Sequence, residues 1–591
     1  MRAIVVDGRQ LEPPFSGSGG CVARLLTFPA VEVTTGVAPR DLLSLVAQVG
    51  EAEDDLLVVD GRLIAHGAAF RTVACDPRWS SALLVNASPV AGRCARAVLI
   101  SEGGALLGLS SPLHRPLASP YRAEGVLRIA GGRVGEFAAG LFRLREQVGS
   151  DAFERAIREA PVEVLACAAL SAGIVLHAVP ARNLVAVRPE DDTERQRAKE
   201  LLDSRDEERA WLANSVKARD GWFTTFLVSP YSRYVARWCA RRGLSPDLVT
   251  AVSLVLGLAA AFSFGVGNRV SLVVGAIVLQ VAFMLDCVDG QLARYSQRFS
   301  AFGSWFDSMA DRAKEYLVYL GLAVGSLRFD DADVWGLALA AMAVQVLRHS
   351  LDLSFERARS AAVIGAAPDV VVEEAGDDGN REVVPVESTH EGRAGVQSTG
   401  HDRPSVVGWL RRILGLPIGE RFAVISIGAA IATPRLVFLV LIVWGAASVA
   451  ARSLLQLRKG LRSGRGLRWL VGVLPRIVEV CAVVAVAMTV GHTAALFAYL
   501  LAVAFRFYDA SHRAKVLGPS SLSTPLRIVL DAWYLRVAVL LAGVLAEVLE
   551  PTAWLLASAV GLLTLTDLVM VWWREPRAST DQPVGDHHDV G

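Results

Sequence analysis

Four aspartates lie close together in the sequence, at positions 286, 289, 307 and 311. Asp286 and Asp289 are three residues apart and Asp307 and Asp311 are four apart, so each pair would lie on one face of a helix. We expect the ends of two facing helices to bring all four carboxylates to one point. Carboxylates that close repel one another unless cations lie between them, and such a set of oxygen ligands suits Mg²⁺.

Glycines and a basic residue accompany these aspartates. Gly290 and Gly303 lack a Cβ atom and would let a backbone or a nucleotide come close, and the forked donors of Arg294 suit a diphosphate. Alternatively, the acidic residues merely cap membrane spans at the water line. Asp307 and Asp311, however, lie within an apolar run, where carboxylates are costly and usually functional. The pattern therefore predicts a metal-dependent site for a phosphorylated ligand.

Long apolar segments must position this site. Hydrophobic residues make up 53% of the chain, a fraction that alone decides little. From Leu248 onward, however, apolar runs of roughly 20 residues recur, the length that a helix needs to cross a bilayer. We therefore expect an α-helical polytopic membrane protein with about ten spans. The predicted spans lie near 247–266, 270–287, 303–326, 333–353, 420–433, 435–456, 469–490, 493–508, 533–549 and 553–573.

Basic residues are unevenly distributed among the loops that connect these spans. The loops that follow the second, fourth, sixth and eighth spans hold most of the arginines and lysines, and the other loops hold few. Loops rich in arginine and lysine usually face the cytoplasm. We expect an integral protein of the cell membrane, with the active site and both termini on the cytoplasmic side.

The composition of the other segments indicates the domain organisation. Residues 1–200 alternate short β-branched runs with helical spacing, which predicts a cytosolic α/β domain. Residues 201–245 are expected to form a linker and an interfacial amphipathic helix, because 221–243 interleaves aromatic residues with arginines. The segment 361–404, expected to be a cytosolic linker, and the tail 575–591 are polar and lack aromatic residues. We expect both to be disordered.

The aspartates and their neighbours resemble the signature of the CDP-alcohol phosphotransferase, or CDP-alcohol phosphatidyltransferase, family. The matching positions are Asp286-x₂-Asp289-Gly290-x₂-Ala293-Arg294-x₈-Gly303-x₃-Asp307-x₃-Asp311. The resemblance implies a six-helix membrane domain over 246–460, followed over 461–574 by extra spans of unknown role. It implies transfer of a phospho-alcohol group from a CDP-alcohol to a polyol or polyol-phosphate acceptor, with release of CMP, in phospholipid or inositol-phosphate lipid biosynthesis. It also implies a homodimer.

The resemblance assigns a role to each signature residue. Two Mg²⁺ or Mn²⁺ ions would be bound by the aspartates, and Asp311 would also act as the general base on the acceptor hydroxyl. The residues expected to bind the nucleotide are Gly290, Ala293, Arg294 and Gly303. The chain departs from the family at Asp247, where the motif before the first helix often has asparagine. This departure concerns the nucleotide contact of that helix and leaves the metal site untouched.

Two further features bear on the substrates. Arg421 opens the fifth predicted span, at the membrane face of the aspartates, and could bind an acceptor phosphate or serve as an interfacial arginine. The N-terminal domain resembles the nucleotidyltransferase half of inositol-1-phosphate cytidylyltransferase/di-myo-inositol-phosphate-phosphate synthases, in domain order and in the segment 189–193. The first lysine of the chain is Lys199, so the domain lacks a lysine to neutralise a departing pyrophosphate. We expect the domain to be non-catalytic.

Two other functions fit parts of the sequence. A transporter would use Arg476, Glu479, Arg506 and Asp567 within the late spans, although these charges could instead pair with one another inside the bundle. A membrane scaffold would carry a vestigial site. The gathering of the signature at one membrane face argues against transport, and the complete aspartate set argues against a scaffold. The net charge of +1 gives no pull toward nucleic acid, and the seven scattered cysteines suggest no zinc site.

Overall fold

The computed structural model describes two compact units, one over Met1–Asn214 and one, helical, that begins at Ser215. Each unit is considered by itself. The described residues are 1–6, 32–37, 39–51, 54–76, 78–94, 96–101, 104–113, 117–217, 220–329, 333–364, 406–462, 470, 472–517 and 530–574. The predicted disordered linker, from residue 365 on, and the predicted disordered tail lie outside them.

The first unit is built on a mixed six-stranded sheet. The strand order is β2 (Glu32–Val37), β1 (Arg2–Val6), β3 (Leu56–Asp60), β8 (Leu117–Ile129), β5 (Ala82–Cys94) and β9 (His177–Pro180). Strand β8 runs antiparallel to its two neighbours, and the other pairings are parallel. Every residue of β3 is buried, as expected for a strand covered on both faces. This arrangement confirms an α/β region at the N-terminus.

Helices and two small sheets complete the first unit. The helices are α2 (Pro39–Glu51), α3 (Gly67–Ala74), α4 (Gly131–Val148), α5 (Ser150–Glu159), α6 (Pro161–Ser171), α7 (Asp192–Ser204) and α8 (Glu207–Ser215). The small sheets pair β4 (Ile64–Ala65) with β10 (Ala186–Val187), and β6 (Val98–Ile100) with β7 (Leu106–Leu109). The Asn214 side chain accepts hydrogen bonds from the backbone and side-chain amides of Asn183. Part of the predicted linker, up to residue 214, is therefore packed on the α/β unit.

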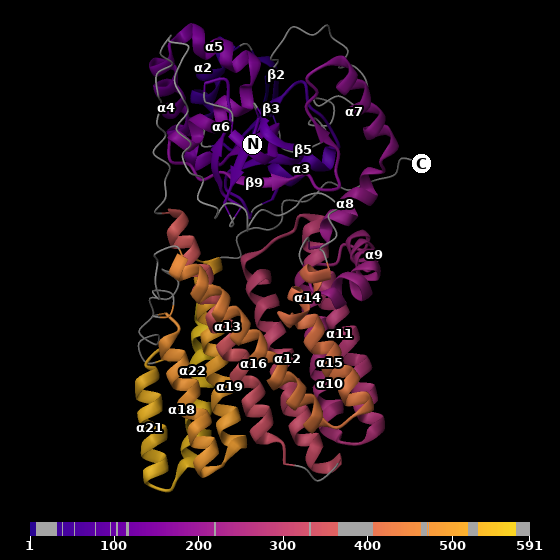
Figure 1. Cartoon of the computed structure of the whole chain (residues 1–591), viewed down its shortest axis with the longest axis vertical. Helices are drawn as coiled ribbons and strands as arrows, with labels where there is room; N and C mark the ends of the chain where they lie inside the picture. The colour runs from indigo at the N-terminus through magenta and orange to yellow at the C-terminus, as the bar shows by residue number, and fades with distance from the viewer. Residues whose placement is uncertain are drawn as a thin grey trace. The chain divides into compact units, whose positions relative to one another are not determined.

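The second unit is helical. Its helices, shown with those of the first unit in Figure 1, are α9 (Ser229–Arg241), α10 (Pro246–Val266), α11 (Arg269–Ser296), α12 (Ala301–Phe329), α13 (Trp335–Ile364), α14 (Val406–Leu414), α15 (Ile418–Ile431), α16 (Pro434–Arg462), α18 (Leu474–Val490), α19 (Thr493–Val516), α21 (Trp533–Leu545) and α22 (Leu549–Arg574). Exposed aromatic side chains on α9 alternate with arginines: Arg233 lies over Tyr234 and Arg242 over Trp238. This composition fits the predicted interfacial helix.

The described residues contain five helices long and apolar enough to cross a membrane: α10, α11, α16, α19 and α22. The pair Gly408–Leu414 and Ile418–Ile431, bent by 66°, would make a sixth span. Helices also occupy the other predicted spans, but α18 and α21 are only 17 and 13 residues long, and α12 and α13 carry charged residues in their middle turns. The structure confirms a polytopic helical region, and the count of ten spans and the orientation stay predictions.

Local sequence signals explain why α11 and α12 meet where they do. Asn268 and Ser271 form a reciprocal capping box at the start of α11, and Gln297 ends that helix in a left-handed conformation with φ 56°. Helix α12 begins four residues later, so the last turns of α11 and the first turns of α12 lie at one level.

Helix α10 packs against both of these helices (Figure 1). At Gly321 of α12, an added Cβ would lie 2.1 Å from the Ala261 carbonyl oxygen. The glycine therefore permits a close approach of the two backbones.

Candidate active site

Three of the four signature aspartates converge. Carboxylate oxygens of Asp286 on α11 and of Asp307 and Asp311 on α12 lie within 4.8 Å of one another. One buried oxygen of Asp311 accepts no hydrogen bond, and the Lys314 ammonium lies 3.3 Å from it. Three carboxylates gathered this closely are suited to a hard divalent cation. The residues present therefore fit the predicted metal site.

Asp289 lies on the same helix as Asp286 but outside this group of three. Its carboxylate accepts a hydrogen bond of 2.5 Å from the Thr250 hydroxyl of α10 and another from the Gly290 backbone amide. The spacing of three residues placed Asp289 near the site without indicating that α10 would engage it. Its role as a metal ligand stays a prediction.

A lysine occupies the space between two of the aspartates. The ammonium group of Lys314 donates to Asp286 and to the Ser253 hydroxyl at 3.1 Å, and it lies 3.3 Å from Asp311. Lys314 is fully buried. From the sequence, an interfacial ion pair and a substrate contact are equal alternatives for Lys314, whose position three residues after Asp311 places both on one helix face.

The predicted nucleotide-binding residues flank the aspartates along α11 and α12. The Arg294 guanidinium donates to the Ser215 carbonyl oxygen, and Gly290 lies one turn earlier, where an added Cβ would be 3.4 Å from that guanidinium. Ala293 is half-buried beside Arg294. Because Gly290 has no side chain, the Arg294 guanidinium can lie against the preceding turn of its own helix, α11.

Asp247, the position at which the chain departs from the family motif, lies against Gly303. A Cβ atom at Gly303 would be 2.3 Å from an Asp247 carboxylate oxygen. Gly303 is thus needed to admit this side chain at the start of α12. Asp247 therefore places a carboxylate directly against Gly303, a residue expected to bind the nucleotide.

Comparison with known proteins identifies this segment. Residues 244–370 match the sequence model of the CDP-alcohol phosphatidyltransferase family. This segment is a CDP-alcohol phosphatidyltransferase domain. It contains α10, α11, α12 and all the signature residues that the sequence singled out.

Curated relatives match over a similar length. The archaetidylinositol phosphate synthase of Pyrococcus horikoshii is 31% identical over 93 residues, which are 16% of this chain and 48% of the relative. The bifunctional IPC transferase and DIPP synthase of Rubrobacter xylanophilus is 35% identical over 126 residues, 21% of this chain and 26% of the relative. The phosphatidylinositol phosphate synthase of Streptomyces avermitilis is 29% identical over 141 residues, 24% of this chain and 54% of the relative. The chain thus spans about half or less of each relative's length.

Arg421, predicted to bind an acceptor phosphate, is buried behind the CDP-alcohol phosphatidyltransferase signature. Its guanidinium makes two hydrogen bonds to Glu315 of α12, at 2.7 and 3.0 Å. Glu315 also accepts bonds from Arg312 at 3.0 Å and from Tyr319 at 2.9 Å. The structure therefore places Arg421 in an ion-pair network, whereas the sequence suggested an arginine open to the interface.

A second buried guanidinium adjoins Arg421. Arg348 of α13 and Arg421 both donate to the Leu416 carbonyl oxygen, at 2.7 and 2.8 Å. The Nε atom of Arg348 is buried without a hydrogen-bond partner, and among the described residues no carboxylate lies within ion-pair distance of it. Two like charges share one acceptor while Glu315 pairs with only one of them. This arrangement leaves a surplus of buried positive charge that an anion could balance. No motif or spacing in the sequence pointed to Arg348.

The charges of the late helices pair with one another inside the bundle. Arg476 and Glu479 lie 2.5 Å apart, and Arg536 also binds Glu479, at 2.8 Å. Arg506 lies 2.8 Å from Asp567. This pairing is the outcome expected if these residues hold the helices together.

An apolar cavity of about 540 Å³ lies between α12, α19 and α22, with Leu254 of α10 also in its wall. Helix α12 contributes Trp305, Phe306 and Met309. With about 100° between successive helical residues, this face points well away from the face that carries Asp307 and Asp311. The cavity is therefore not part of the aspartate site.

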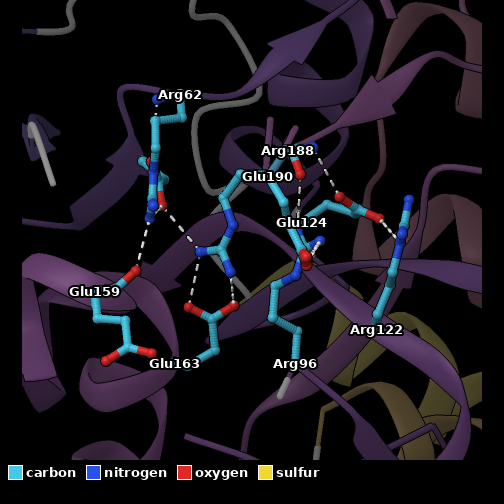
Figure 2. Close-up of polar contacts among 9 residues, drawn as sticks. Arg62, Arg96, Arg122, Glu124, Glu159, Glu163, Arg188 and Glu190 are labelled. Atoms are coloured by element: carbon cyan, nitrogen blue, oxygen red, sulfur yellow. Dashed lines mark hydrogen bonds and ion pairs between the residues drawn. The ribbon is translucent and has the colours of Figure 1, made fainter. Parts of the chain in front are cut away.

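The α/β unit has a cluster of buried carboxylates of its own, but arginines bind them (Figure 2). Arg188 contacts Asp60 at 2.9 Å and Glu163 at 2.6 Å. Asp60 ends strand β3 and is also bound by Arg62 at 2.7 Å. Burial by itself would raise the pKa of the Asp60 carboxyl, but the hydrogen bonds and charges of Arg62 and Arg188 hold that pKa below its usual value. The carboxylates of this network are therefore paired with arginine side chains of the same unit.

Proposed function

We propose that the chain transfers a phospho-alcohol group from a CDP-alcohol to an acceptor hydroxyl and releases CMP. The observation that carries this proposal is the convergence of Asp286, Asp307 and Asp311 within the matched family segment. Four carboxylates beside a diphosphate require cations, and the gathering of three of these carboxylates within 4.8 Å supports a cation there. An acidic cluster kept intact within the signature is not expected of a vestigial scaffold.

Two Mg²⁺ or Mn²⁺ ions are proposed as cofactors. Their proposed ligands are Asp286, Asp289, Asp307 and Asp311. When bound, the metals would neutralise charge on the phosphoryl group under attack and on the departing CMP. Around them, Gly290, Ala293, Arg294 and Gly303 are proposed to bind the nucleotide, with Arg294 contributing donors to the diphosphate.

Asp311 is proposed as the general base. Its carboxylate would take the proton of the acceptor hydroxyl as that oxygen forms a bond to the phosphorus atom. The bond from this phosphorus to the CMP oxygen breaks, and CMP leaves with the electron pair. Asp311 suits the role because the buried ammonium of Lys314 lies 3.3 Å from one of its carboxylate oxygens. The positive charge favours the ionised form of the carboxylate.

The first prediction concerns metal removal. The purified chain should release CMP from a CDP-alcohol in the presence of Mg²⁺ or Mn²⁺ and should lose this activity in EDTA, because the aspartates alone would repel the diphosphate. CMP is measured by chromatography, and the control is restoration of activity by excess Mg²⁺. Undiminished CMP release in EDTA would contradict the metal-dependent mechanism.

A polyol phosphate is proposed as the acceptor. Two relatives are named as synthases of inositol phosphate lipids, and the surplus positive charge of Arg348 and Arg421 supports an acceptor that carries phosphate. Arg421 keeps its proposed role, now together with Arg348. The product would belong to phospholipid or inositol-phosphate lipid biosynthesis.

The proposed setting is the cell membrane. The chain would act there as a homodimer, with the aspartates and both termini on the cytoplasmic side, as the distribution of loop arginines predicts. Transport is the rival function, and it relied on the charges in the late helices. Because Arg506 and Asp567 pair with each other, these charges are better explained as contacts between helices.

The α/β unit is proposed to be a non-catalytic, nucleotidyltransferase-like domain. The arginines on Asp60, Glu124 and Glu163 support this proposal, because buried carboxylates that bind a catalytic metal would need free oxygens. Glu124 is enclosed in the same way: burial raises the pKa of its carboxyl despite the neighbouring Arg122 and Arg96.

The second prediction follows from this closed network. The test uses the full chain carrying Asp311→Asn, which lacks the proposed base for phosphotransfer. This variant should form no CDP-alcohol from CTP and an alcohol phosphate, inositol phosphate included. A coupled pyrophosphate assay measures the reaction, and an added active cytidylyltransferase is the positive control. Release of pyrophosphate by the variant would show that the chain is bifunctional.

A further inference from the structure

The least expected feature of the aspartate site is a cation that belongs to the chain. The Lys314 ammonium donates to Asp286 and to Ser253 and lies 3.3 Å from Asp311. Both carboxylates are among the three whose oxygens converge. The Lys314 ammonium therefore lies in the space where a metal ion bound by these two carboxylates would lie.

Helix α10 is shaped to hold this lysine. A Cβ atom at Gly257 would lie 2.5 Å from the Lys314 Cγ, so only glycine leaves room for the side chain. One turn earlier, the Ser253 hydroxyl donates to the Ala282 carbonyl at 2.8 Å and accepts from Lys314. Lys314 is completely buried, and a buried ammonium is retained only where partners replace its water. Specific contacts with α10 therefore hold the lysine side chain in the site.

We propose that Lys314 takes the place of one metal ion while the site holds no substrate, so that the second ion binds together with the diphosphate. This inference rests on the proposed function. It assigns an order of binding: one metal ion first, then the CDP-alcohol and the second ion together.

Formal charges support this order. Counted over the four aspartates and Lys314 alone, one divalent ion leaves a charge of −1 and a second would make it +1. Lys217 and Arg294, which interact electrostatically with Asp307, add positive charge and oppose the second ion further. The diphosphate of a CDP-alcohol brings about two negative charges, which offset the charge of the second ion. The second ion is therefore opposed by Lys314 before the substrate arrives and favoured after it. The three N–H donors of an ammonium also allow Lys314 to exchange a carboxylate partner for a phosphate oxygen.

Manganese binding tests the proposal directly. In the purified full chain, free Mn²⁺ measured by electron paramagnetic resonance should show one tightly bound ion without nucleotide and two with CDP, which carries the diphosphate. Lys314→Met keeps the length of the side chain and removes its charge. This variant should bind two ions without CDP, with the affinity for the second ion at least about tenfold higher than in the wild type, since ligand charge sets metal affinity.

Stability provides a second readout, independent of catalysis. In EDTA, Lys314→Met should unfold at a lower temperature than the wild type, because buried carboxylates lose their cation, and Mn²⁺ should restore the loss. Lys314→Gln, which can still bond to Ser253, serves if the methionine variant does not fold. Arg312→Met is the matched control: it removes a buried cation from the same helix that pairs with Glu315, and it should leave the Mn²⁺ stoichiometry unchanged.

The outcomes separate this inference from the proposed function. Two ions bound by the wild type without CDP, or the same stoichiometry and affinity in the wild type and both Lys314 variants, would overturn the role of Lys314 and leave the enzyme proposal standing. A wild type that binds no Mn²⁺ with or without CDP would overturn the metal site itself.

Discussion

Asp311→Asn should reduce turnover by about 10²–10⁴-fold, the usual contribution of a general base, while retaining most of the nucleotide binding. The amide cannot accept the acceptor proton, but it keeps the size of the side chain and weakens only one metal ligand. Turnover is measured as CMP release at saturating Mg²⁺, and nucleotide binding as the dissociation constant of CDP. A loss of kcat with little change in CDP affinity is the expected signature.

Asp307→Asn is the matched control, because Asp307 lies in the same group of carboxylates but has no proposed role as a base. Excess Mn²⁺ should recover part of its lost activity, since only metal affinity is weakened. Asp311→Asn should not recover, because no concentration of metal replaces the proton acceptor. Wild-type turnover by Asp311→Asn would show that Asp311 is not the base.

The location of the site could be predicted from sequence because local geometry determines it. Spacings of three and four residues place each pair of aspartates on one helix face, and the break at Gln297 brings the end of α11 beside the start of α12. The apolar runs likewise predicted where the helices of the second unit lie. Their length alone did not show which of them cross the bilayer, since α12 and α13 carry charges in their middle turns.

The partners of individual side chains could not be predicted, because they depend on contacts between helices far apart in the sequence. Asp289 is bound by Thr250 of α10, and Arg421 is bound by Glu315 of α12, 106 residues away. No short motif specifies such pairs. Lys314 was visible as a residue after the signature, but its hydrogen bonds to Asp286 and Ser253 and the space left by Gly257 show that it turns inward.

The acceptor site gives the other large expected effect. Arg348→Met should raise the KM for a polyol-phosphate acceptor at least about tenfold, because a hydrogen bond to a charged group contributes about 1.5–3 kcal/mol. Neither the KM for the CDP-alcohol nor the KM for an unphosphorylated polyol should change appreciably. Initial rates with both forms of the acceptor measure the difference.

Arg348 is the sharper variant because it can be removed without breaking an ion pair. Arg421→Ala would leave the fully buried Glu315 with Arg312 as its remaining guanidinium, and losing one partner of a buried pair destabilises a protein by about 3–5 kcal/mol. Arg421→Ala should therefore raise the acceptor KM and lower the unfolding temperature together, whereas Arg348→Met should affect mainly KM. If both variants left the KM for the phosphorylated acceptor unchanged, the two arginines would serve only to hold α12, α13 and α15 together. The acceptor would then be an uncharged alcohol.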